Sequence, residues 1–125
     1  MEVRRRPWLR CLAVAFCAAL IACEEGATVR VTGFGAEDPN AFCRDFRLTE
    51  AQAKTFFAKA KPVTAEAIHR EYTWLPCYVD GTIQRKGDSA LKWRIRPIGI
   101  GQVFHEGGAE EWLGCPDCDK LFPPK

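Results

Sequence analysis

The sequence predicts an α+β domain in which one or two helices pack on a four-stranded antiparallel β-meander that disulfides brace. Three observations support this fold class. Apolar residues recur with the period of a helix between residues 49 and 61, and with the period of a strand from Trp74 onward. Four cysteines also remain in the part of the chain that follows an N-terminal leader.

Two helices are expected in the first half of the domain. Thr49 and Gln52 have the spacing of a capping box, and Pro62 ends the pattern. The first helix should bury one apolar stripe made of Ala53, Phe56, Phe57 and Ala60. A second and shorter helix is expected from an N-cap at Thr64 to Tyr72.

Alternating apolar and polar residues predict the strands. A short strand over 28–32 should end at Gly33 and Gly35. Four more should form the meander, near 78–84, 91–96, 100–105 and 110–115. Gly81 is expected to form a bulge.

Gly107-Gly108 has the composition of a two-residue turn between the last two strands. Such a turn would place His105 opposite Glu110, and Val103 on the same face as Trp112. Trp112 would then lie either under the helices or exposed to solvent.

The N-terminus has the parts of an export signal. A basic segment contains Arg4, Arg5, Arg6 and Arg10, and an apolar stretch covers residues 11–22. This stretch is shorter than the roughly 20 apolar residues that a spanning helix needs. Its last residues and the next one, Leu20-Ile21-Ala22-Cys23, resemble the lipobox of bacterial prolipoproteins.

The resemblance implies that residues 1–22 are a signal peptide that is removed by cleavage between Ala22 and Cys23. Cys23 would carry the lipid and anchor the chain to a bilayer, leaving residues 23–125 as a single small domain. Glu24 follows where Asp would mark retention in the inner membrane. We therefore expect a bacterial cell-envelope lipoprotein, with the outer membrane favoured over the inner one.

The leader accounts for the net positive charge of the chain. Beyond residue 22, 14 Lys and Arg face 15 Asp and Glu, so the remaining chain is close to neutral. It has no basic excess to bind phosphates, which argues against a nucleic-acid partner.

Cys43, Cys77, Cys115 and Cys118 remain after lipidation of Cys23, and an even number in an exported domain predicts two disulfides. Their pairing stays open. In a flat meander, Cys77 and Cys115 would lie three strand spacings apart, roughly 14 Å, whereas a disulfide tolerates about 7 Å between Cα atoms. A structural role is expected for all four.

Cys115-Pro116-Asp117-Cys118 also has the spacing of a thiol–disulfide motif. It follows an antiparallel strand close to the end of the chain, which is not the usual setting of such enzymes. A zinc site would need Cys77 or His105 to complete the ligands.

The inventory of catalytic groups predicts no enzyme, no cofactor and no metal. Ser89 is the single serine, and it lacks the glycines of a nucleophile elbow. The two histidines, His69 and His105, are best interpreted as packed or surface side chains.

A binding surface is the more plausible functional feature. An exposed Trp112 beside Arg94 and Arg96 would have the composition of an interaction hot spot, although the Lys92-Arg94-Arg96 stripe is most simply a solvated face. We expect a non-catalytic domain that binds a periplasmic protein, in the manner of an inhibitor or immunity protein. The alternatives are a thiol–disulfide or metal-handling protein that uses Cys115 and Cys118, and a structural envelope component.

Overall fold

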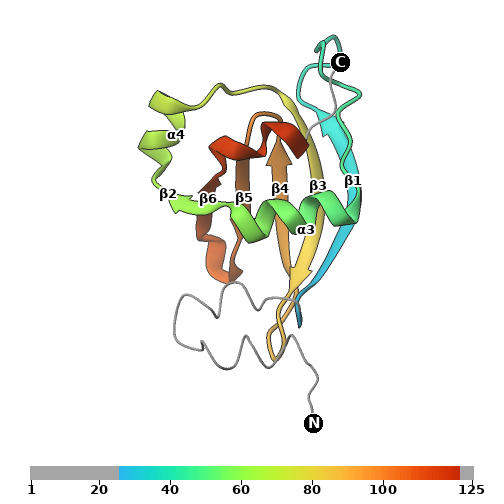
Figure 1. Cartoon of the computed structure of the whole chain (residues 1–125), viewed down its shortest axis with the longest axis vertical. Helices are drawn as coiled ribbons and strands as arrows, with labels where there is room; N and C mark the ends of the chain where they lie inside the picture. Colours follow the sequence, from blue (N-terminus) through green and yellow to red (C-terminus); the bar gives the residue numbers. More distant parts are fainter. Residues whose placement is uncertain (1–25, 122–125) are drawn as a thin grey trace.

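The computed structural model describes residues 26–121, which form one antiparallel sheet with two α-helices and two disulfides (Figure 1). The expected disulfide-braced α+β fold is confirmed. The predicted signal peptide, its cleavage site at Ala22 and Cys23, and the lipidated Cys23 itself lie outside the described residues. Within residues 26–121, no helix has both the length and the apolar character needed to cross a bilayer.

The sheet has six strands. The sequence predicted a short strand over 28–32 and a meander of four. The observed strands are β1 (Thr28–Ala36), β2 (Lys61–Val63), β3 (Cys77–Gln84), β4 (Leu91–Arg96), β5 (Ile100–Phe104) and β6 (Glu110–Gly114). Their order across the sheet is β1-β3-β4-β5-β6-β2. Strands β3 to β6 therefore lie side by side in chain order, and β1 and β2 extend the sheet at its two edges.

Strand β1 is longer than predicted. The β-bulge that the sequence predicted at Gly81 of β3 lies in β1 instead. Val31 pairs with Gly81 and Gly33 pairs with Asp80, so Thr32 is the extra residue. Gly81 has a different role. A Cβ atom there would lie 1.9 Å from the backbone oxygen of Arg30 and 2.2 Å from the Trp93 ring, so only glycine lets these groups approach.

Helix α3 (Glu50–Lys59) begins with the predicted capping box. Thr49 accepts a hydrogen bond from the backbone of Gln52, and the Gln52 side chain accepts one from the backbone of Thr49. The helix ends before Pro62, which lies in edge strand β2 opposite Leu113. Proline is tolerated there because an edge strand does not need every backbone donor for the ladder.

Helix α3 lies across one face of the sheet, which we call the packed face (Figure 1). Ala53 and Phe56 of the helix belong to the same buried cluster as the inward side chains of the strands. Those strand residues are Val79, Ile83, Trp93, Ile95, Val103 and Leu113. The stripe prediction therefore identified the core side of α3, although Phe57 and Ala60 are only half-buried.

Helix α4 (Ala65–Glu71) begins at the predicted N-cap, where Thr64 accepts a hydrogen bond from Ala67. Ile68 is buried, but it does not belong to the main core cluster. The segment after the helix runs back across the opposite side of the sheet, where the Tyr72 hydroxyl lies over Gly114. We call this side the second face.

Candidate functional site

The second face gathers the three residues that the sequence singled out for binding. Antiparallel pairing aligns Asp80 with Arg94, Arg94 with Gln102, and Gln102 with Trp112. Directly paired residues point to the same side of a sheet, so Trp112 and Arg94 share this face. Arg96 shares it as well, two residues further along β4.

The turn before β6 differs from the prediction, and this decides the side of Trp112. The loop between the paired residues Phe104 and Glu110 contains a 3-10 turn at Glu106–Gly108. His105 therefore does not face Glu110; its Nε2 lies 2.9 Å from Glu111 Oε1. The pairing is shifted by one residue, which turns Trp112 away from Val103 and the core.

Arg94 is held by a carboxylate and an aromatic ring. Its Nε and Nη2 donate to the two carboxylate oxygens of Asp80 at 2.7 and 3.0 Å. Its guanidinium carbon lies 3.6 Å from the centre of the Tyr78 ring. The hydrogen bonds to Asp80 raise the pKa of Arg94 above its ordinary value, which outweighs the effect of burial. The side chain is therefore a fixed cation on the second face.

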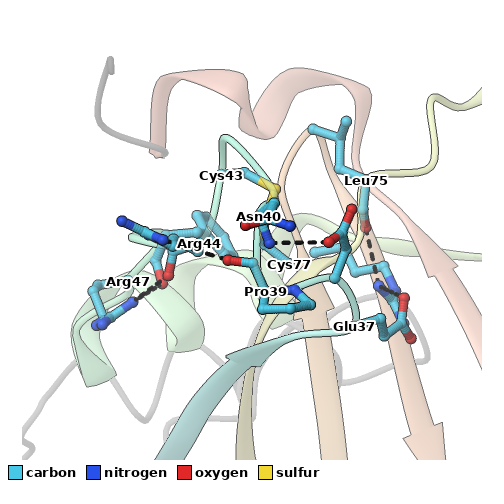
Figure 2. The surroundings of a disulfide bond; sticks show 11 residues. Glu37, Pro39, Asn40, Cys43, Arg44, Arg47, Leu75 and Cys77 are labelled. Carbon is cyan, nitrogen blue, oxygen red and sulfur yellow. Dashed lines mark hydrogen bonds and ion pairs between the residues drawn. A yellow bond between two sulfur atoms is a disulfide. The ribbon is translucent and has the colours of Figure 1, made fainter.

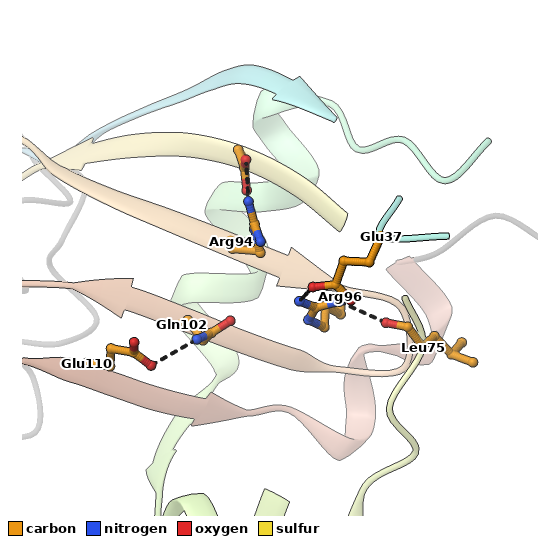
Figure 3. Close-up of polar contacts among 7 residues, drawn as sticks. Glu37, Leu75, Arg94, Arg96, Gln102 and Glu110 are labelled. Carbon is orange, nitrogen blue, oxygen red and sulfur yellow. Dashed lines mark hydrogen bonds and ion pairs between the residues drawn. The ribbon is translucent and has the colours of Figure 1, made fainter. Parts of the chain in front are cut away.

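Arg96 is buried, so the expectation of a solvated Lys92-Arg94-Arg96 stripe is wrong for this residue. Its side chain is 3% exposed and donates to both carboxylate oxygens of Glu37 at 3.2 and 2.8 Å (Figure 3). It also donates to the backbone oxygen of Leu75 at 3.0 Å. The hydrogen bond from Arg96 lowers the pKa of Glu37 below its ordinary value, against the raising effect of burial.

Two tryptophans complete the arrangement. The guanidinium carbon of Arg96 lies 3.9 Å from the centre of the Trp74 ring. The Trp74 ring in turn lies 6.2 Å from the Trp112 ring at a tilt of 57°. Trp74 is 45% exposed, although it contacts both neighbours. The second-face cluster, as we use the term, consists of Trp74, Tyr78, Arg94, Arg96 and Trp112.

A shallow hollow of about 380 Å³ continues the cluster along the sheet. Asp80 and Arg94 form one wall, and Lys92 and Phe104 lie further along the strands. Lys92 is exposed, as the stripe interpretation expected for it. The surface beside the aromatic rings is therefore concave and contains an exposed cation.

One disulfide holds the loop that supplies Glu37. Cys43 is bonded to Cys77 at the start of β3, with 5.8 Å between their Cα atoms (Figure 2). The backbone of Glu37 donates to Pro76 at 2.8 Å, next to the same disulfide. Both cysteines are buried, so this bond fixes the loop against the sheet from inside.

The second disulfide joins Cys115 to Cys118, with 5.3 Å between their Cα atoms. The prediction of two disulfides is confirmed, and the pairing that the sequence left open is now defined. Cys77 cannot complete a zinc site with Cys115 and Cys118, because it is bonded to Cys43. Across residues 26–121, no three His, Cys, Asp or Glu side chains come together to hold a metal ion.

The residues that the sequence offered for catalysis do not belong to the second-face cluster. Ser89 is exposed in the loop between β3 and β4, and His69 is exposed on α4. His105 and Glu111 are each more than a third exposed beside the β5–β6 loop. A solvated pair at a strand end is the simplest description of these two side chains.

The sequence analysis missed four contributors: Glu37, Trp74, Tyr78 and Asp80. A signal existed for two of them, because Tyr78 and Asp80 alternate with the buried side of β3. They therefore had to face the same side as the arginines of β4. Glu37 and Trp74 lie in irregular segments, where no periodicity indicates a partner.

Comparison with known proteins finds no family model that matches this chain and no significant match among curated proteins or solved structures. Functional inference must therefore come from the geometry of the site.

Proposed function

We propose that this protein is a lipid-anchored bacterial envelope protein whose domain binds another protein through the second-face cluster. The observation that supports the proposal is the stacking of two tryptophans, a tyrosine and two arginines on one side of the sheet. Trp, Tyr and Arg are the residues most enriched at interaction hot spots. The proposed role is non-catalytic, as in an inhibitor or immunity protein.

The cluster is organised before any partner arrives. Asp80 and Glu37 each hold one guanidinium with two hydrogen bonds, and the rings stack on those guanidinium groups. Side chains that are already fixed lose little conformational entropy on binding. A flat, planar guanidinium is also suited to stacking against aromatic or peptide groups of a partner.

The position of the first strand relative to the proposed lipid anchor also favours binding at the second-face cluster. Strand β1 runs from Thr28 at one end of the sheet to Ala36 at the other, a span of roughly 28 Å at the usual rise per residue. Trp74 precedes β3, which begins opposite Ala36 at the far end (Figure 1). A lipid on Cys23, three residues before Gly26, would hold the near end at the membrane. The far end would then be directed into the periplasm.

Other apolar side chains are exposed at the same far end. Phe42 belongs to the loop that Cys43 ties to the start of β3, and Ile98 lies in the turn between β4 and β5. Ile98 is exposed and has a φ of 69°, an unfavourable backbone angle for a β-branched residue. Strained and exposed residues of this kind are typical of binding loops.

Site-specific photo-crosslinking in the bacterial envelope tests the binding role. A photoreactive residue at Thr73, which is exposed next to Trp74 at the far end of the sheet, should give one discrete protein adduct, and the same residue at exposed Lys54 of α3 should not. Trp74→Ala and Trp112→Ala should each abolish the Thr73 adduct. With the purified partner, each should weaken binding by about 2 kcal/mol, or about thirtyfold in Kd.

Phe34→Ala is the matched control, because it also removes an exposed aromatic ring that stacks on an arginine, but Phe34 pairs with Val79 and therefore lies on the packed side of the sheet. Equal adducts from Thr73 and Lys54, or an adduct that survives both tryptophan substitutions, would contradict binding through this face. Labelling with a radioactive fatty acid tests the anchor separately: Cys23→Ala should eliminate incorporation.

A further inference from the structure

The two disulfides differ in what they can contribute to the fold. Cys43 and Cys77 are 34 positions apart, whereas Cys115 and Cys118 are 3 apart. The entropic stabilisation by a disulfide grows with the length of chain that it closes. Backbone hydrogen bonds already hold the short segment, from Cys118 to Cys115 at 3.1 Å and from Cys115 to Gly99 at 2.9 Å. The Cys115–Cys118 bond therefore stabilises the fold less than the Cys43–Cys77 bond does.

This bond also borders a cavity at the surface. The cavity has a volume of about 590 Å³ and lies where β2, β6 and the following 3-10 helix, Pro116–Leu121, meet. Cys115 belongs to its wall, and Cys118 does not. Pro116 and Asp117 are exposed between them. Cys115 is 3% exposed and Cys118 is 0% exposed, so of the two cysteines only Cys115 has any surface toward a partner in the cavity.

The charge of the cavity favours an incoming anion. Lys59 and Lys61 line it, and Asp117 is the acidic residue among the described lining side chains. Nearby cations favour a thiolate over a thiol, and the thiolate is the form that attacks a disulfide. Tyr72 forms another wall, and burial, with a smaller effect of Glu71, raises the pKa of its hydroxyl. That hydroxyl consequently remains neutral at physiological pH.

We propose that Cys115–Cys118 is a redox-active disulfide that accepts electrons from a polypeptide with two neighbouring thiols, bound at the cavity beside Lys59 and Lys61. The substrate class is an exported chain with acidic residues near its cysteines. This activity uses a different set of residues from the second-face cluster and does not rest on the proposed protein-binding function.

The exchange balances in two steps. A substrate thiolate attacks Sγ of Cys115, the bond to Cys118 breaks, and Sγ of Cys118 receives the electron pair and takes a proton from water. The second substrate thiolate then attacks the substrate sulfur of the mixed disulfide, and Cys115 leaves as a thiolate. The substrate loses two electrons and gains a disulfide, and this protein gains both electrons as a dithiol.

The first test uses the mature protein in detergent, equilibrated with defined mixtures of reduced and oxidised glutathione. Differential alkylation and peptide mass spectrometry measure each disulfide separately, so Cys43–Cys77 is the internal control. We expect Cys115–Cys118 to open in mixtures that leave Cys43–Cys77 intact, while circular dichroism remains that of the folded protein. Equal resistance of the two bonds, or opening of Cys115–Cys118 only together with unfolding, would overturn the proposal.

The second test identifies the attacked sulfur and the role of the cavity. Cys118→Ala should form a mixed disulfide through Cys115 with a single-cysteine peptide supplied as its 2-pyridyl disulfide, which releases 2-thiopyridone, and Cys115→Ala should form much less through Cys118. A peptide with glutamates beside its cysteine should react several-fold faster than one with lysines. The double substitution Lys59→Ala and Lys61→Ala should remove that preference, and Lys54→Ala on the same helix should retain it. A preference unaffected by the double substitution would disprove the role of the cavity.

Discussion

The two faces of the sheet are built from the same strands, but different forces hold their side chains. On the packed face, Phe56 and Trp93 are fully buried and meet other apolar groups. On the second face, Arg94 and Arg96 are held by carboxylates and aromatic rings. Apolar burial is the main source of folding free energy, whereas partly exposed ion pairs contribute little. We therefore propose that the order of the second face serves recognition.

The packed face should show the largest loss of stability. Phe56→Ala removes a fully buried ring that fills the space over Gly101, so we expect the free energy of unfolding to fall by about 3–5 kcal/mol. Urea denaturation measures the difference. Phe42→Ala is the control, because Phe42 is 73% exposed and should change stability by less than about 0.5 kcal/mol. Similar losses for both would mean that α3 does not form the core.

A smaller effect should distinguish two glycines on neighbouring strands. Gly81→Ala introduces a methyl group against the backbone of Arg30 and the Trp93 ring, so it should cost about 1–3 kcal/mol. Gly33→Ala has open space around the new Cβ and should have much less effect. Thermal and urea unfolding of the two variants provide the comparison. Equal destabilisation would contradict close packing of Trp93 over Gly81.

The ion pair between exposed Glu37 and buried Arg96 makes the stability of the second face depend on pH. The pKa of Glu37 is lowered from 4.5, so the folded state binds fewer protons than the unfolded state in acid. Its stabilising contribution is full above pH 4.5 and is lost as the pH falls through the lowered folded-state value. The difference in unfolding free energy between the wild type and Glu37→Gln should therefore shrink below pH 4.5. A constant difference between about pH 7 and about pH 3, an interval that spans the ordinary pKa range of carboxyl groups, would contradict this linkage.

The smallest effect is expected for the partly exposed pair of Asp80 and Arg94. Their side chains are 35% and 28% exposed, so solvent screens their attraction. A double-mutant cycle with Asp80→Asn and Arg94→Gln should give a coupling energy below about 1 kcal/mol. The same substitutions should weaken binding of the partner more than they weaken the fold. A coupling energy several times larger would place this pair among the determinants of stability.

Several elements of the fold could be predicted because their signals are local. The capping box at Thr49 specified the start of α3, and alternation predicted the four strands of the meander. Strand β2 was missed because three residues are too short to show a period, and Pro62 argued against a strand. Its position at the edge depends on Leu113, about 50 residues away along the chain.

The candidate site was predictable only in part. Arg94, Arg96 and Trp112 were named together, but the expected turn at Gly107-Gly108 placed Trp112 on the side of Val103. The actual loop shifts the pairing by one residue, and such a shift exchanges the faces of a strand. Trp74 and Glu37 come from irregular segments whose position follows from the Cys43–Cys77 bond and from contacts with Arg96.

By itself, the sequence determined the helix starts, the disulfide-braced α+β class and the presence of two disulfides, but not the six-stranded sheet. These features depend on residues a few positions apart, or on the number of cysteines. Only the tertiary structure decided which cysteines pair, which strands lie at the edges, and which face carries Trp112. Those outcomes depend on how distant segments pack together. A shift of one residue in a loop changes the cross-strand neighbours of every residue in the strand that follows it.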